Sequence, residues 1–412
     1  MNLSTNQPIN QPITVEQAIE IILQNALDLP AEAVPFADAL GRVLREDLRA
    51  DRDFPPFDRV TMDGIAVRFS AFEAGRRSFR IEGMAAAGAP RTVLGHTENC
   101  IEVMTGAMLP QGADTVVRYE DLHLENGVAT VQIEAVTQFQ NIHNQGIDRR
   151  AGDLLVPAGR RIGPAEIGTA ATVGKEKLWV SRLPRTAIVA TGDELVAVGA
   201  EPLPHQIRAS NVFSVQALLA ELGVDGRVFH FPDNEKTLRE GLEKVLAEHE
   251  LVVISGAVSA GKFDFVPTVL ADLGVEKLFH AVAQRPGKPF WFGRAAGERG
   301  ARVFALPGNP VSTFLCTVRF VLPWLRRRLG MTAAPPEFAV LGSDLVFKPD
   351  LTYFVPVKLE NRGGQLLAHT LAGHGSGDLA NLNDANAFLE IPRGREQFRA
   401  GEAFGLWRFP HR

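Results

Sequence analysis

The stretch that decides the fold runs from Leu251 to Ser312 and contains three similar segments. They read LVVISGAVSAGKFDF from residue 251, FHAVAQRPGKPFWFG from residue 279 and ARVFALPGNPVSTF from residue 301. Each segment opens with an apolar run, breaks at glycine and passes into a polar turn or a helix start. Parallel strands deliver their loops to one edge of a sheet in this way. The three segments therefore predict one site at the carboxyl edge of a parallel sheet.

The first loop combines small residues with a cation and a carboxylate. Gly256, Ser259 and Gly261 allow backbone N–H groups to approach an anion closely, and Lys262 adds positive charge. Asp264 stands where the next helix begins, and it has two interpretations. It is either a charge that favours the helix dipole or a ligand for Mg²⁺ held against phosphates. On the evidence of this residue alone, we favour the charge at the helix start over the Mg²⁺ ligand.

The third loop contains the rigid sequence Pro307, Gly308, Asn309 and Pro310, followed by apolar residues at helical spacing. One interpretation is an ordinary strand-to-helix turn, because Pro310 preorganises a first turn that Asn309 or Ser312 can cap. The other is a loop that faces phosphate. The chain has no GxxxxGK[ST] pattern and no GxGxxG after a strand, which leaves a P-loop or dinucleotide-binding fold unsupported.

Length and composition indicate a soluble globular protein of several domains. The 412 residues predict two to four domains, and 45% apolar with 22% charged residues is ordinary for this class. The net charge of −5 argues against a nucleic-acid partner. No long apolar run or apolar leader is visible, so we expect a cytoplasmic protein without a membrane partner. Cys100 and Cys316 are expected to be buried thiols.

A helix near the amino terminus opens with a capping box formed by Thr14 and Gln17. Its apolar stripe needs a partner, for which we expect the second amphipathic helix that Pro164 starts. We expect two segments, at 10–50 and 142–182, to flank an inserted β domain of short strands at 51–141, followed by an α/β domain at 183–331 and a β domain at 332–412.

Two of these domains carry recognisable local signals. Asn126 and Gly127 separate two strand-like runs and predict a hairpin. In the α/β domain strands and helices alternate, which predicts three layers. Glu194 follows the first strand, beside Asp193, and Asp233 follows a later one. Because both lie after strands, a role in the site is favoured over a helix-start carboxylate.

Five motifs spread over the chain carry a family resemblance. They are TMDGIAV from residue 61, TGDEL from residue 191, SGAVSAGKFDF, RPGKPFWFG and LPGNPVS. Together they resemble the molybdopterin molybdenumtransferase family, which includes MoeA and the E domain of gephyrin. The resemblance implies a multidomain α/β plus β fold: an elongated interrupted domain, a small inserted β domain, a three-layer α/β molybdopterin-binding domain and a C-terminal β-barrel-like domain.

The resemblance also implies roles for residues that would otherwise be ordinary turn residues. Asp63 in TMDGIAV, Thr105 in MTGAMLP and Ser376 in GHGSGDL match site positions, as does Asp148. The implied catalytic residues are Asp63, Asp148, Glu194 and Asp264, and the implied metal ligands are Glu194, Asp233 and Asp264. The implied substrate-binding residues are Thr105, Gly256, Ser259, Gly261, Lys262, Arg285, Lys288, Pro307, Gly308, Asn309, Pro310 and Ser376.

Such a mixed set of charges fits metal-assisted phosphate chemistry. Carboxylates repel molybdate or pyrophosphate unless a divalent cation lies between them, whereas Lys262, Arg285 and Lys288 can meet the anions directly. The resemblance implies that adenylylated molybdopterin and molybdate are the substrates, Mg²⁺ is the cofactor and AMP is released. It further implies a homodimer that works with molybdopterin adenylyltransferase and apo-molybdoenzymes.

Two other functions remain open at this stage. Molybdopterin adenylyltransferase resembles the α/β domain alone, so the additional β domains argue against that activity. A non-catalytic scaffold like gephyrin would need a linker signal that the sequence lacks. One departure from the family also stands out, because most relatives carry lysine where this chain has Ala281, four residues before Arg285.

Overall fold

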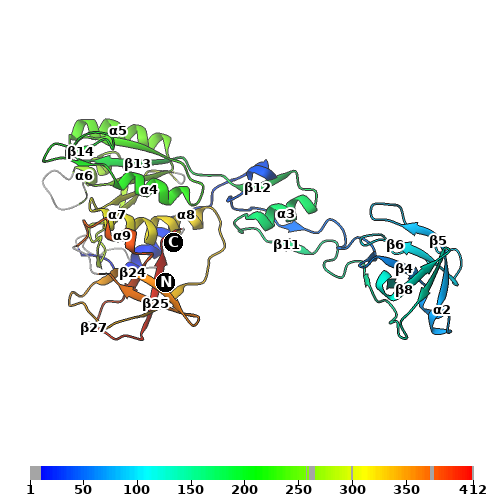
Figure 1. Ribbon diagram of the computed structural model, residues 1–412. Helices are drawn as coiled ribbons and strands as arrows, with labels where there is room; N and C mark the ends of the chain where they lie inside the picture. The colour runs from blue at the N-terminus through cyan, green and yellow to red at the C-terminus, as the bar shows by residue number, and fades with distance from the viewer. Residues whose placement is uncertain (1–10, 257, 259–264, 298–299, 372–374, 411–412) are drawn as a thin grey trace, which may run out of the picture.

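The computed structural model describes residues 11–256, 258, 265–297, 300–371 and 375–410. The chain forms a large lobe and a long arm (Figure 1). The lobe contains the α/β sheet and a C-terminal barrel, and the arm ends in a separate β domain. Among the described residues, no helix combines the length and apolarity that crossing a membrane requires.

The α/β domain is built on a six-stranded sheet in the order β16-β13-β17-β21-β20-β18. The first four strands are parallel, and the last two run antiparallel to their neighbours. The central strands are fully buried because helices cover both faces. The strand bounds are Gly226–Phe231 (β16), Thr186–Thr191 (β13), Leu251–Ser255 (β17), Arg302–Leu306 (β21), Trp291–Arg294 (β20) and Glu276–His280 (β18).

Alternate residues of the sheet point into two cores, one on each face. Ile188 of β13 shares a core with Val215 of α4, whereas Val189 shares the other with Leu242 of α5. The three-layer prediction is therefore confirmed. Helices α4, α7 and α8 cover the face to which Ile188 points, and α5 and α6 cover the face to which Val189 points. The helix bounds are Asn211–Ala220 (α4), Glu235–Glu248 (α5), Val266–Asp272 (α6), Pro310–Cys316 (α7) and Leu322–Arg328 (α8).

The sheet register brings the predicted loops to one edge. Ser255 at the end of β17 lies opposite Leu306 at the end of β21, and Ala305 lies opposite Trp291. Trp291 in turn lies opposite His280, the last residue of β18. The loops after residues 255, 280 and 306 therefore leave the same edge, as the sequence predicts.

Helix α1 (Val15–Gln24) begins with the predicted capping box, but the partner expected for it is wrong. Its buried residues Val15 and Ile22 share a core with Trp324 and Leu325 of α8. Helix α3 (Pro164–Thr172) instead contributes to a separate core in the arm. Periodicity shows which face of a helix is apolar, but it does not show which element covers that face.

Two short antiparallel ladders form the part of the arm next to the lobe. Strand β1 (Ala31–Pro35) pairs with β12 (Lys177–Ser181), and β2 (Leu48–Arg49) pairs with β11 (Leu154–Val156). Each ladder joins the segment before the insertion to the segment after it. Residues far apart in sequence are therefore held side by side along the arm.

The inserted β domain forms the far end of the arm (Figure 1). Its sheet has the order β7-β4-β6-β5-β9-β8. Asn126 and Gly127 have φ values of 49° and 76° and connect β8 to β9, so the predicted hairpin is confirmed. The strand bounds are Thr115–Arg118 (β7), Gly64–Val67 (β4), Asn99–Val103 (β6), Ser78–Ala85 (β5), Val128–Val131 (β9) and Leu122–Glu125 (β8).

The C-terminal domain is a closed barrel. Its strands follow the order β24-β25-β22-β28-β26, and β26 pairs with β24 to close the circle. Closure leaves the barrel strands without free edges, and the predicted β-barrel-like domain is confirmed. The bounds are Thr352–Arg362 (β24), Gln365–Thr370 (β25), Glu337–Leu341 (β22), Ala403–Arg408 (β28) and Ala387–Ile391 (β26).

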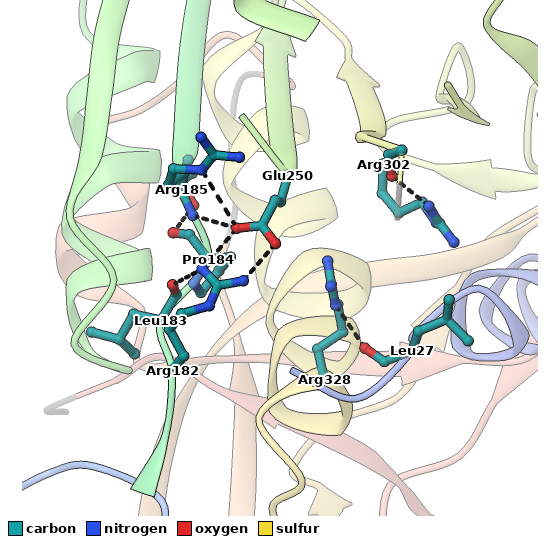
Figure 2. A network of polar contacts seen from close by, with 10 residues as sticks. Leu27, Arg182, Leu183, Pro184, Arg185, Glu250, Arg302 and Arg328 are labelled. Carbon is teal, nitrogen blue, oxygen red and sulfur yellow. Dashed lines mark hydrogen bonds and ion pairs between the residues drawn. The ribbon is translucent and has the colours of Figure 1, made fainter. Parts of the chain in front are cut away.

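A charged network joins the arm to the lobe where β12 leads into β13. Glu250 accepts two hydrogen bonds from Arg182, at 2.6 and 2.9 Å, and a third from the backbone N–H of Arg185 at 3.2 Å (Figure 2). Burial opposes ionisation of Glu250, but these donors outweigh it and hold the pKa of the carboxyl below its usual value. The backbone N–H of Arg182 also donates to the carbonyl of Pro30. The two segments that connect the lobe to the arm, one before β1 and one after β12, therefore meet here.

Candidate functional site

Two pockets open at the carboxyl edge of the sheet. The interdomain pocket, about 900 Å³, is lined by residues 284–289, by the loop after β21 and by the barrel side. The sheet-edge pocket, about 440 Å³, lies between the ends of β13, β17 and β21 and the start of α4. Asn309 and Gly377 line both pockets. The loops singled out in the sequence therefore surround two adjoining spaces.

The interdomain pocket contains the two predicted cations that the structure describes. Arg285 and Lys288 line it and are exposed to solvent. Strand β19 (Gln284–Arg285) pairs with β24, which sets Arg285 opposite Tyr353 of the barrel. Burial raises the pKa of Tyr353, and the positive charge of Arg285 acts against that rise. The positive charges of Arg285 and Lys288 can therefore attract an anion into the pocket directly.

Asn309 and Ser376 join the α/β domain to the barrel side of this pocket. The amide Nδ2 of Asn309 donates to Ser376 Oγ at 2.7 Å, and the backbone N–H of Val311 donates to the Ser376 carbonyl at 3.1 Å. Asn309 does occupy the residue before α7, as the turn interpretation predicts, but its side chain reaches Ser376. Two residues identified through separate motifs thus meet in one place.

The sheet-edge pocket holds Glu194 and the glycines of two loops. Gly256, with φ of 105°, approaches Thr191 so closely that an added Cβ would lie 2.9 Å from the Thr191 carbonyl oxygen. Gly308 lies beside Gly256, because its own added Cβ would be 3.7 Å from the Gly256 Cα. Larger side chains at residue 256 would therefore separate the loops after β13 and β17.

The predicted metal ligands are brought together only in part. Glu194 lines the sheet-edge pocket, and the Asp193 carboxylate accepts a hydrogen bond from the backbone N–H of Asp233 at 3.1 Å. Asp264 lies outside the described residues, as do Ser259, Gly261 and Lys262. Within the described part of the chain, no three acidic, histidine or cysteine side chains form a group that could hold a metal.

Asp63 and Thr105 form a pair in the inserted β domain. Oδ1 of Asp63 accepts hydrogen bonds from the Thr105 backbone N–H at 2.6 Å and from its hydroxyl at 2.8 Å. These two hydrogen bonds lower the pKa of Asp63, which keeps the exposed carboxylate ionised. Asp63 precedes β4 and Thr105 follows β6, so the pair belongs to the inserted β domain, which forms the far end of the arm (Figure 1).

Asp148 lies in the arm, close to the boundary with the inserted β domain. His143 Nε2 is 3.3 Å from Oδ1 of Asp148, and the other ring nitrogen is 3.1 Å from an Arg59 guanidinium nitrogen. The Asp148 side chain is 56% exposed. Within one chain, the implied site residues that the structure describes therefore form two groups, one in the lobe and one in the arm.

Comparison with known proteins covers nearly the whole chain. Three family models match: "MoeA N-terminal region (domain I and II)" over residues 13–174, "Probable molybdopterin binding domain" over 187–327 and "MoeA C-terminal region (domain IV)" over 339–409. A molybdopterin molybdenumtransferase from Synechocystis is 36% identical over 96% of this chain and 99% of its own. The chain belongs to the molybdopterin molybdenumtransferase family. A second family member, from Staphylococcus epidermidis, is 31% identical over 95% of this chain and 94% of its own.

A solved structure confirms the family fold. The crystal structure of a molybdopterin biosynthesis MoeA protein from Pyrococcus horikosii has a TM-score of 0.83 and 32% sequence identity. The match covers 98% of this chain and all of the other. The elongated arm, the α/β domain and the barrel therefore belong to the fold of this family.

The structure also describes two features that bear on this chain as a family member. Cys100 and Cys316 are free and buried, as predicted, and burial raises the pKa of each thiol to about 12. Ala281, at the position expected to carry lysine, has φ of 78° and forms backbone hydrogen bonds with Ile13 and Phe290. Arg285 and Lys288, in contrast, line the interdomain pocket.

Sequence reasoning missed several polar residues that line the pockets, including Tyr353 and Asn211. Tyr353 comes from the barrel and Asn211 from the first turn of α4, and neither belongs to a quoted motif. The sequence offered one usable signal, because asparagine is a weak helix former and stands here just inside a helix. Such a residue is often retained for a side-chain hydrogen bond outside the helix.

Proposed function

We propose that this chain inserts molybdate into adenylylated molybdopterin, with hydrolysis of the pyrophosphate linkage and release of AMP. As a family member, it is an enzyme of molybdenum cofactor biosynthesis. The observation that supports the specific reaction is the interdomain pocket, which is lined by Arg285 and Lys288 and by the hydrogen-bonded pair Asn309 and Ser376. Such a pocket offers cations and hydrogen-bonding groups to molybdate and to the pyrophosphate of the adenylylated substrate.

The described side chains suit positioning more than covalent chemistry. Arg285 presents a planar fork of donors that matches an oxyanion, and Lys288 adds a point charge nearby. Both cysteines are buried with a raised pKa, so a protein thiolate is a poor candidate ligand for molybdenum. The substrate's own dithiolene sulfurs would bind the metal, while the protein holds the reacting groups and neutralises charge.

Mg²⁺ is part of the proposal, with Glu194, Asp233 and Asp264 as its ligands. Oxygen ligands are those that this cation prefers, and two of the three follow strands of the α/β sheet. When bound, the cation would neutralise the pyrophosphate charge that these carboxylates otherwise repel. Its ligand set depends on Asp264, which lies outside the described residues.

A homodimer would unite the two groups of site residues. Asp63, Thr105 and Asp148 lie in the arm, while the two pockets lie in the lobe. We propose that the arm of one subunit completes the lobe site of the other. Molybdopterin adenylyltransferase as supplier, apo-molybdoenzymes as recipients and the cytoplasm as location belong to the same proposal.

The direct test is turnover by the purified chain. Adenylylated molybdopterin with molybdate and Mg²⁺ should give molybdenum cofactor and AMP in equal amounts. Molybdopterin with ATP should give no adenylylated product. Adenylylation of molybdopterin by this chain, without molybdate insertion, would overturn the proposal in favour of adenylyltransferase activity.

A further inference from the structure

Asn211 joins two of the site loops through one side chain. Its amide Nδ2 donates to Ser255 Oγ at 3.0 Å and to the carbonyl oxygen of Gly308 at 2.7 Å. Ser255 ends β17 and Gly308 lies in the loop after β21. Both hydrogens of the amide group are therefore engaged.

The orientation of this amide is determined by its partners. If the side chain were flipped, Oδ1 would face the Gly308 carbonyl, and two acceptors would repel each other. Serine can donate or accept, but a backbone carbonyl can only accept. The oxygen of Asn211 must therefore point away from Gly308.

That oxygen is buried without a hydrogen-bond partner among the described residues, and so is the hydroxyl of Thr191. Thr191 is only 5% exposed, and both residues line the sheet-edge pocket. Leaving a buried acceptor unsatisfied is costly, so such groups usually meet a ligand or an ordered water. Two of them in one pocket of about 440 Å³ indicate a place for a donor.

We propose that Asn211 is a recognition residue for substrate, resting on the function proposed above. Its Nδ2 holds the loops after β17 and β21 together, while its Oδ1 accepts a hydrogen bond from an exocyclic amino group on a heterocycle of the bound substrate. The Thr191 hydroxyl assists as a second polar contact. Both the pterin and the adenine of the proposed substrate carry such an amino group.

The test measures binding of matched probes that differ in this amino group. One pair is AMP and purine riboside 5′-monophosphate, and the other is 6-hydroxymethylpterin and its 2-deamino analogue. For one of the two pairs, the wild-type chain should bind the amino probe about tenfold more tightly or better, since a site built around a hydrogen bond rejects analogues that lack it. The pair that shows this preference identifies the ring.

Three variants separate recognition from general loss of structure. Asn211→Ala should reduce the preference to about twofold or less, and Asn211→Asp should keep much of it, because the carboxylate still accepts while the hydrogen bonds to the loops are lost. Gln216→Ala removes a side-chain hydrogen bond to the Gly226 carbonyl on the same helix, outside the pocket, and should keep the full preference. Thr191→Val should partly lower the preference for the amino probe, and it provides the test if Asn211→Ala does not fold.

The proposal is overturned if the wild-type chain shows no preference for either amino probe. It is also overturned if Asn211→Ala and Thr191→Val both retain the wild-type preference. Failure of the wild-type chain to convert adenylylated molybdopterin would instead count against the proposed reaction, because these binding measurements contain no molybdate. A purely structural Asn211 would weaken both members of a pair equally.

Discussion

At the scale of single residues, charge in the interdomain pocket is concentrated in Arg285 and Lys288. Both line the pocket, and Arg285 lies opposite Tyr353 in the register of β19 with β24. Ala281, where relatives are expected to carry lysine, is engaged through its backbone with Ile13 and Phe290. The guanidinium of Arg285 cannot lose its proton and can hold an oxyanion at two points, so it is suited to compensate for the missing lysine.

We therefore predict that Arg285→Ala raises the molybdate concentration for half-maximal insertion at least tenfold, which corresponds to about 1.4 kcal/mol. Binding of the adenylylated pterin should change little. Initial rates over a molybdate series would measure the effect, with Arg393→Ala as control, because Arg393 pairs with Asp350 outside this pocket. An unchanged molybdate dependence would mean that the anion is held elsewhere.

At the scale of elements, the junction between arm and lobe is stabilised by the largely buried carboxylate of Glu250 and the arginines around it. The Glu250 carboxylate is 13% exposed and accepts two hydrogen bonds from Arg182. Neighbouring Arg328 is also largely buried, which lowers its pKa to about 10 even though the nearby Glu250 carboxylate acts to raise it. Loss of the Glu250 charge would remove the carboxylate that favours the charged forms of both Arg182 and Arg328 (Figure 2).

Glu250→Gln should lower the free energy of unfolding by about 2 kcal/mol at pH 7, because a hydrogen-bonded ion pair is lost. The folded-state pKa of Glu250 lies below its unfolded value, so its stabilisation is fully present above pH of about 4.3 and is lost as pH falls through the folded pKa. Denaturant melts of both proteins at several pH values should therefore converge in acid. As a control, Glu243→Gln, at an exposed position of α5, should change the free energy of unfolding little. A stability difference between wild type and Glu250→Gln that stays constant down to pH of about 2 would contradict this account.

Helix α1 provides the clearest example of what sequence can and cannot predict. Its start and its apolar face were both predictable, because capping and periodicity are local properties. The hairpin at Asn126 and the start of α7 at Pro310 were predictable for the same reason. The element that covers α1 was not, because many faces are apolar enough to pack against it.

Packing of α1 against α8 can be tested by substitutions in its buried stripe. Ile22→Ala should destabilise the lobe by about 3 kcal/mol, whereas Leu23→Ala, at a position that is 37% exposed, should cost far less. In double variants Ile22→Ala should couple with Leu325→Ala by ~0.5 kcal/mol or more and add simply with Ile162→Ala of the arm core. Hydrogen exchange of the lobe would report these changes. Coupling to Ile162 instead would restore the pairing of α1 with the arm.

At the scale of the whole molecule, the arm separates residues that the family motifs assign to one site. The family motifs indicated Asp63 and Ser376 equally well, but only the structure shows that Asp63 lies in the arm whereas Ser376 lines the interdomain pocket of the lobe. Asn211 was missed because its role depends on three segments that meet only in the folded sheet edge. Long-range assembly is therefore the part of the site that local patterns cannot predict.

We predict that the chain is a homodimer in solution. Light scattering at micromolar concentration should give twice the chain mass of 44.8 kDa. A subunit that must borrow an arm should lose activity on dilution below the dimer dissociation constant. A monomer with full activity would refute the proposed exchange of arms.

The most direct measurement mixes two inactive variants, one defective in the arm and one in the lobe. Asp63→Asn and Glu194→Gln should each abolish conversion of adenylylated molybdopterin while leaving the melting temperature nearly unchanged, since each keeps the shape of its side chain. After dissociation and reassociation, mixed dimers should contain one site with an intact arm and an intact lobe. About a quarter of wild-type activity should then return, given random pairing in a symmetric dimer. If dimers mix freely and no activity returns, the site is completed within one chain and the account of a shared site is wrong.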